Sequence, residues 1–148
     1  MFKKIVFATD GSLDADQALG FATELAKEAG SEMLVVHCEE FTLPGKGGGR
    51  YPTAANEDEL ESKIARQVAE LSREGVRATL TTTRANVGGA AHVIAEAART
   101  AHADAIVVGT RGHTPLAALL VGSVTQRLLH IAPCPVIAVP SGDRNGSA

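Results

Sequence analysis

The sequence predicts an α/β fold, built as a single open sheet of five parallel strands with helices on both faces. Short apolar runs rich in β-branched residues alternate with amphipathic stretches of helical length along the 148 residues. This β-α-β-α order requires crossover connections, which join parallel strands through helices. In addition, residues 105–108 are apolar without alternation, which is typical of a central parallel strand covered on both faces.

Turn and cap residues set the expected elements in the first part of the chain. A strand over residues 5–8 leads into a turn at 9–12, and Ser12 suits the N-cap of the helix that follows. Gly30 suits the end of that helix, because glycine adopts the left-handed conformation that closes a last turn. A second strand is expected over residues 33–38.

Residues 39–55 show no hydrophobic period and are rich in glycine and proline. We interpret this segment as a mobile surface loop. Its glycines surround Lys46 and resemble a phosphate loop, but the Gly-Lys-Ser/Thr ending is missing. The segment also does not lead directly from a strand into a helix, so a phosphate loop is not favoured here.

The second part of the chain continues the alternation. A helix is expected from Asn56, and its acidic residues are interpreted as a solvated first turn that complements the helix dipole: Glu57, Asp58, Glu59 and Glu61. A less buried strand over 76–83 follows, and then a helix opened by the glycines at 88 and 89. After the central strand at 105–108, a helix over 123–131 and a strand over 136–139 complete the pattern.

Length and composition bound the possible functions. The length favours one domain, over residues 1–140, with a polar tail over 141–148. A net charge of −3 argues against nucleic-acid or anionic-membrane binding through bulk charge. Aromatic residues make up 3% of the chain and tryptophan is absent, which argues against a base-stacking platform.

The cysteines and the apolar runs predict the compartment. Cys38 and Cys134 do not form a disulfide framework, and we interpret them as small buried apolar residues. The first apolar run is too short for a signal peptide, and no run has the length of a membrane span. We therefore expect a soluble, cytoplasmic protein without a membrane partner.

Ligands of open parallel sheets bind beyond the carboxyl ends of the strands, where the winding reverses. This rule points to the residues after the first strand, Thr9 and Asp10, and after the second, His37 and Cys38. Asp10 could contact a ribose hydroxyl or a metal, or it could cap the helix that starts near Ser12. His37 is expected to belong to the core or to the wall of the site.

The segment after the central strand carries the strongest sign of chemistry. Gly109 and Gly112 permit a tight turn and a close approach of backbone to a ligand. Gly122 and Ser123 stand at an expected helix N-terminus, where free N–H groups and the helix dipole favour an anion. Hydroxyl groups of Ser123 and Thr125 add donors, and Arg111 and His113 could supplement them. The alternative is that the glycines only shape a turn and Ser123 is an ordinary cap.

With these motifs in place, the whole chain resembles a universal stress protein domain. The matching segments are residues 5–12, the strand end Val36-His37, residues 103–112 and residues 133–140. The ATP-binding branch of that family carries Gly-x-x-Gly, nine residues and Gly-Ser/Thr. Here Gly109 and Gly112 are followed by the nine residues 113–121 and then by Gly122-Ser123.

The resemblance implies an adenine nucleotide alpha hydrolase-like sheet with strand order 3-2-1-4-5. It implies ATP as the ligand, held together with Mg²⁺ or Mn²⁺, to which Asp10 would contribute. It also implies a homodimer formed through the edge strand over residues 136–139. The implied nucleotide-binding residues are Ala8, Thr9, Asp10, Cys38, Gly109, Arg111, Gly112, Gly122, Ser123, Val124 and Thr125.

Three functions remain open on the sequence. The first is a nucleotide-dependent regulatory module of a stress response. The second is a slow ATPase, for which Asp10, His37 and His113 are the candidate bases, although none lies in a recognisable catalytic motif. The third is an interaction domain without nucleotide, against which the intact glycine pattern argues. The histidines show no metal-ligand spacing, so we do not expect a metal site made by protein groups alone.

Overall fold

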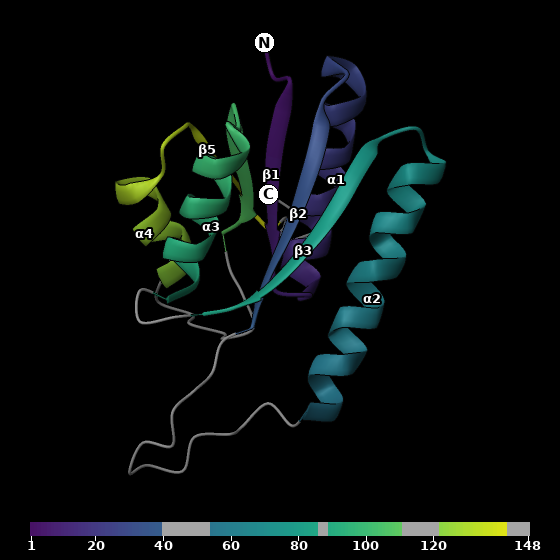
Figure 1. The fold of residues 1–148 in the computed structure, drawn as a ribbon, viewed down its shortest axis with the longest axis vertical. Coiled ribbons are helices and arrows are strands. Elements are labelled where there is room, and N and C mark those ends of the chain that lie inside the picture. Colours follow the sequence, from purple (N-terminus) through teal and green to yellow (C-terminus); the bar gives the residue numbers. More distant parts are fainter. Residues whose placement is uncertain (40–53, 86–88, 111–121, 142–148) are drawn as a thin grey trace, which may run out of the picture.

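The computed structural model describes residues 1–39, 54–85, 89–110 and 122–141. They form one sheet with the strand order β3-β2-β1-β4-β5, and all four strand pairs are parallel (Figure 1). This confirms the predicted fold class and strand order. The elements are β1 (Lys4–Thr9), α1 (Leu13–Ala29), β2 (Glu32–Glu39), α2 (Ala54–Arg73), β3 (Arg77–Arg84), α3 (Gly89–Ala101), β4 (Ala105–Gly109), α4 (Ser123–Ile131) and β5 (Val136–Val139).

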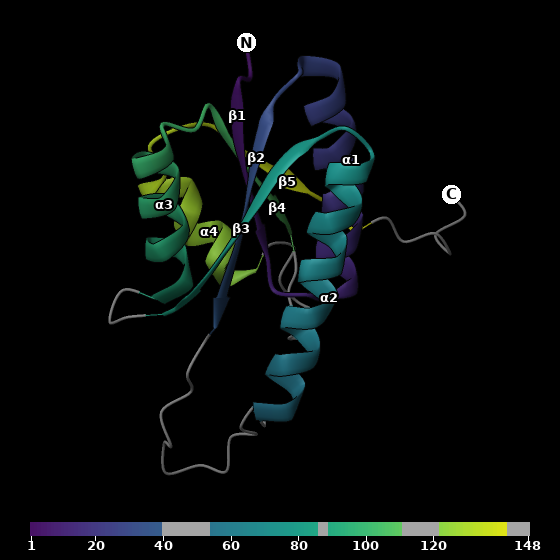
Figure 2. The same ribbon diagram turned by 45° about the vertical axis from the view of Figure 1, so that its right-hand side comes forward.

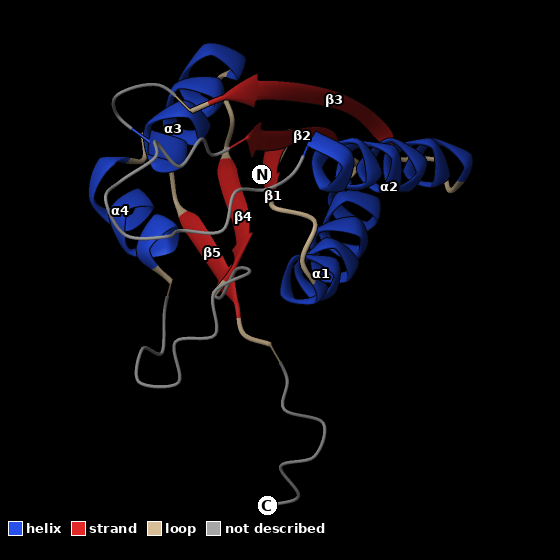
Figure 3. Cartoon of the chain, turned by 90° about the horizontal axis from the view of Figure 1, so that it is seen from below, coloured by secondary structure: helices blue, strands red, loops and turns tan. Residues whose placement is uncertain are grey.

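The sheet lies between two helical layers, with α1 and α2 on one face and α3 and α4 on the other (Figure 3). Successive side chains of a strand point to opposite faces, so β1 contributes to both cores. Ile5 and Phe7 pack with α1 and α2, whereas Val6 and Ala8 pack with α3 and α4. The central strands are therefore apolar at successive positions, as the sequence predicts.

Caps fix the ends of α1 as expected. The Ser12 hydroxyl accepts a hydrogen bond from the Ala15 N–H at 3.2 Å, which satisfies one of the free donors of the first turn. Gly30 ends the helix in the left-handed conformation, with φ 67°. Both predicted caps are confirmed.

Helix α2 begins at Ala54, so the prediction of a start at Asn56 is wrong. The predicted loop also loses residues at both ends, because Glu39 belongs to β2 and residues 54 and 55 belong to α2. Residues 40–53 lie outside the described residues, and so does the polar tail from residue 142. Glu57 and Glu61 belong to the first turns of α2 and lie beside Glu39 at the end of β2.

The outer strands differ from the central ones in burial. Strands β3 and β5 are the two edge strands of the sheet (Figure 2). The side chains of β3 are exposed or half-buried, as expected for a less buried strand, and those of β5 are half-buried. The free start of β1 is tied to β4 by Asp104, whose carboxylate accepts hydrogen bonds from the N–H groups of Lys3 and Lys4. None of the helices in the described residues is long and apolar enough to cross a bilayer.

Candidate functional site

Three of the residues singled out in the sequence, Thr9, His37 and Gly109, lie at the carboxyl edge of the sheet. Thr9 of β1 is in register with His37 of β2, and Gly109 of β4 is in register with Val139 of β5. Strand β1 lies between β2 and β4, so the chain winds in one direction through β2 and β3 and in the other through β4 and β5. The reversal point therefore falls between Asp10 and Gly109, where open parallel sheets bind their ligands.

The turn from β1 to α1 is fixed by its own side chains. The Thr9 hydroxyl accepts from the Gly11 N–H at 3.0 Å, and the Asp10 carboxylate accepts from the Ser12 N–H at 2.9 Å. Gly11 has a φ of 76°, a value that favours glycine. One oxygen of the Asp10 carboxylate thus holds the turn that precedes α1, whose N-cap is Ser12.

The other side of the reversal point is the start of α4. The N-cap is Gly122, which has no side chain to satisfy the free N–H groups of the first helical turn. Ser123 is therefore the first helical residue and not the cap, and its side chain is exposed. Thr125 is buried, and its hydroxyl donates to the Gly109 carbonyl at 2.9 Å, which ties α4 to the end of β4. Arg111, Gly112 and His113 lie outside the described residues.

His37 forms a contact that sequence reasoning missed. Its side chain is only 3% exposed, and Nδ1 lies 3.0 Å from the Thr9 carbonyl oxygen. Nε2 lies 2.5 Å from a carboxylate oxygen of Glu57. The expectation of a core or wall residue is consistent with this burial, but Glu57 is not a solvated residue, as its side chain is 22% exposed and bound to His37. A signal in the sequence is the position of Glu57 seven residues, or two helical turns, before Ile64, which is buried in the core.

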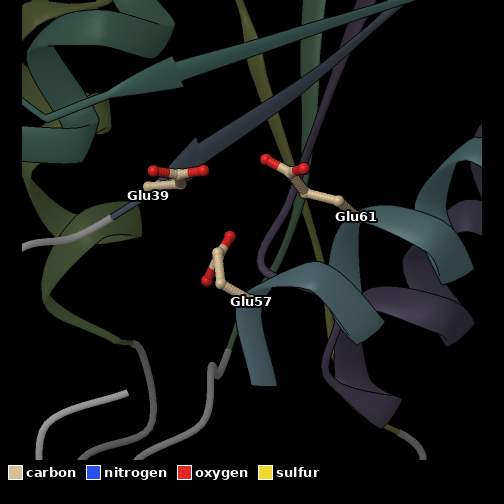
Figure 4. Close-up of side chains that lie close together, drawn as sticks. All are labelled: Glu39, Glu57 and Glu61. Carbon is tan, nitrogen blue, oxygen red and sulfur yellow. The ribbon is translucent and has the colours of Figure 1, made fainter. Parts of the chain in front are cut away.

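Three carboxyl groups gather beside this pair. Glu39, at the end of β2, lies close to Glu57 and Glu61 of α2, with carboxylate oxygens within 4.8 Å of one another (Figure 4). A hydrogen bond with Glu39 raises the pKa of Glu61, and burial and the nearby negative charges raise it further. Glu39 also pairs with Arg84, whose Nε donates to a carboxylate oxygen of Glu39 at 3.3 Å.

The two cysteines differ in their distance along the fold from the carboxyl edge of the sheet, with only Cys38 near the end of its strand. Cys38 and Cys134 are free thiols and each is half-buried, so the expectation of fully buried residues is only partly met. Burial raises the pKa of the Cys134 thiol, which keeps it protonated and unreactive. Cys38 stands next to His37 at the end of β2, beside the reversal point.

A family model of the universal stress protein family matches residues 1–140 of this chain. The chain belongs to that family. A universal stress protein of Thermus aquaticus is 36% identical over 143 residues, which cover 94% of this chain and 99% of the relative. Family membership thus extends over all nine helices and strands of the described residues.

Solved structures of the family share the fold. A Burkholderia pseudomallei member is 29% identical, with a TM-score of 0.72 over 95% of this chain and 97% of the other. A universal stress protein from Archaeoglobus fulgidus in complex with dAMP is 27% identical, with a TM-score of 0.66 over 93% and 98% of the two chains. A further universal stress protein, in complex with cAMP, is 22% identical, has a TM-score of 0.61 over 93% and 97%, and supports the fold alone.

Proposed function

We propose that this universal stress protein binds an adenine nucleotide, ATP with Mg²⁺ or Mn²⁺, and acts as a nucleotide-dependent regulatory module. The observation that carries the proposal is the start of α4. A helix N-terminus whose cap is glycine leaves its first N–H groups unsatisfied by a side chain, and it stands at the reversal point of a parallel sheet. The dAMP complex of the Archaeoglobus fulgidus relative supports an adenine nucleotide as the ligand.

In this proposal the residues on each side of the reversal point bind a different part of the nucleotide. Ala8, Thr9, Asp10 and the backbone of Cys38 line the adenosine side, at the ends of β1 and β2. Asp10 also contributes to the metal that accompanies the phosphates. The ribose and phosphates are held by the end of β4 and the start of α4, through Gly109, Gly122, Ser123, Val124 and Thr125, together with Arg111 and Gly112 outside the described residues.

The phosphate contacts would come mainly from the backbone. The hydroxyl of Thr125 already donates to Gly109, so its contribution to a phosphate is its N–H group. The hydroxyl of Ser123 is exposed and adds a side-chain donor. Such a cradle suits an anion because the helix dipole and several N–H groups act together.

A regulatory role is favoured over hydrolysis by the state of His37. Both ring nitrogens have partners, Thr9 and Glu57, so the imidazole is not placed to orient a water molecule. The proposal includes action in the cytoplasm and a homodimer. Residues 136–139 are apolar, half-buried and at the edge of the sheet, where a second copy could cover them.

The test begins with protein purified without added nucleotide. Denaturation and mass analysis identify a released ligand, and calorimetric titration of the emptied protein compares ATP, AMP and cAMP. We expect ATP to bind, and Gly122→Val to reduce its affinity at least tenfold, because a branched side chain blocks the approach of a phosphate to the helix start. Gly20→Ala, on the exposed face of α1, is the matched control and should bind as the wild type does.

Two results would contradict the proposal. One is the absence of any heat with all three nucleotides together with no released ligand. The other is unchanged ATP affinity in the Gly122→Val variant, which would remove the start of α4 from the site. A phosphate-release assay on the ATP-bound protein then distinguishes ATP binding alone from ATP hydrolysis.

A further inference from the structure

Two side chains from other elements donate hydrogen bonds to backbone carbonyl groups of the turn between β1 and α1. The His37 ring donates from Nδ1 to the Thr9 carbonyl at 3.0 Å. The Lys63 ammonium donates to the Gly11 carbonyl at 2.9 Å. The Thr9 carbonyl belongs to the peptide group that precedes Asp10, and the Gly11 carbonyl to the peptide group that follows Gly11, so the backbone is anchored on both sides of the Asp10–Gly11 pair.

Each of these two donor side chains also contacts an acidic side chain. A carboxylate oxygen of Glu57 lies 2.5 Å from Nε2 of His37, and Asp16 lies 2.7 Å from Nζ of Lys63. A carbonyl oxygen only accepts, so Nδ1 of His37 carries a hydrogen. Nε2 and the carboxylate would repel each other at this distance without a proton between them, so the pair holds one, on either partner.

Helix α2 supplies most of this support. Lys63 and Gln67 lie one turn apart on this helix, and Gln67 donates to the second oxygen of Asp16 at 2.9 Å. The exposed pair of Lys63 and Asp16 would contribute little alone, with side chains 32% and 30% exposed. Its importance is geometric, because the same ammonium group reaches the backbone of the turn.

We propose that His37 and Lys63 are positioning residues for adenine-nucleotide binding, acting through the Thr9–Gly11 turn and held in place by Glu57 and Asp16. This inference rests on the proposed function. The anchored turn presents the Asp10 carboxylate and the adjoining backbone in one arrangement, so ordering them takes less free energy when the ligand binds. Helix α2 thereby becomes coupled to occupancy of the site without touching the ligand.

The test is ATP titration with Mg²⁺ at a temperature well below the melting point of each variant. We expect Lys63→Met and Glu57→Ala to weaken ATP binding three- to tenfold. Lys63→Arg should restore most of the affinity, because guanidinium reaches both acceptors. Glu57→Gln should do the same, because its amide donates to a neutral His37 ring.

A stability control separates positioning from general damage. Val68→Ala, farther along α2 and packed on the core, should lower the melting temperature and leave the affinity unchanged. If the wild type binds while Lys63→Met and Glu57→Ala bind equally well, the positioning role is overturned and the proposed function stands. Equal weakening by Val68→Ala, or failure of both conservative variants to restore binding, also overturns it. If the wild type binds no adenine nucleotide, the proposed function fails and this inference with it.

Discussion

Leu60 of α2 occupies the space in which a side chain on Gly11 would stand. A Cβ atom built on Gly11 would lie 2.6 Å from Cδ2 of Leu60, well inside van der Waals contact. Gly11 also has a positive φ of 76°. The backbone conformation of the β1–α1 turn therefore favours glycine at position 11, and a side chain there would in addition displace the side chain of Leu60.

The first prediction concerns this contact. Gly11→Ala should lower the free energy of unfolding by about 1–3 kcal/mol, since it combines backbone strain with overpacking. Gly20→Ala is the matched control, because Gly20 lies inside α1 with open space around its missing Cβ. That variant should gain about 0.5–1 kcal/mol. Urea unfolding measures both, and a Gly11→Ala protein as stable as the wild type would contradict the contact.

We expect the contribution of Asp104 to the free energy of unfolding to be lost in acid. Hydrogen bonds from the backbone N–H groups of Lys4 and Lys3 lower the pKa of its carboxyl group. A lowered pKa in the folded state means that the ionised form stabilises the fold, and that this contribution is lost as the pH falls through the folded pKa. Asp104→Asn should be less stable than the wild type at pH 7, and the difference should shrink in acid. A constant difference across a urea series from pH 7 to acid would disprove this linkage.

For Glu61 we expect the opposite dependence of stability on pH. Its hydrogen bond with Glu39 raises its pKa above the ordinary value of 4.5. The protonated form therefore stabilises the fold, fully below 4.5, and this contribution is lost as the pH rises through the folded pKa. Glu61→Gln should melt higher than the wild type at pH 7 and equally at pH 4. Glu70→Gln, exposed on the same helix, is the control and should show no such change. An unchanged melting temperature of Glu61→Gln at pH 7 would argue against the raised pKa of Glu61.

The role of the Asp10 carboxylate can be assigned by comparing two variants. Asp10→Asn keeps an oxygen that accepts from the Ser12 N–H, whereas Asp10→Ala loses it and should cost about 1 kcal/mol of stability. If Asp10 helps to hold the metal, both variants should weaken ATP binding more with Mg²⁺ present than without it. Equal losses with and without Mg²⁺ would assign the carboxylate to the ribose, and full affinity in both variants would leave it only the structural role of holding the turn before α1. Calorimetric titration in the presence and absence of Mg²⁺ distinguishes these outcomes.

Much of the fold could be predicted from local patterns. The alternation of apolar runs with helical periods indicated every strand and helix, and Ser12 and Gly30 marked the ends of α1 because capping depends on neighbouring residues. The start of α2 was misplaced, since no side-chain cap marks it in the described residues and Asn56 imitates one. The glycine pattern around residues 109–123 identified the candidate phosphate site, because backbone access needs glycine at fixed positions.

The sequence by itself thus determined the order of strands and helices along the chain and the residue types at the strand ends, whereas the strand order in the sheet came from the family resemblance. Only the tertiary structure decided which side chains meet there. His37 and Glu57 are 20 positions apart, and Lys63 and Gly11 are 52 apart, so no local period relates them. Their contacts depend on how α2 lies across the sheet, which is set by packing of the whole core. For the same reason the acidic residues of α2 read as solvated in the sequence, although Glu57 and Glu61 face the end of β2.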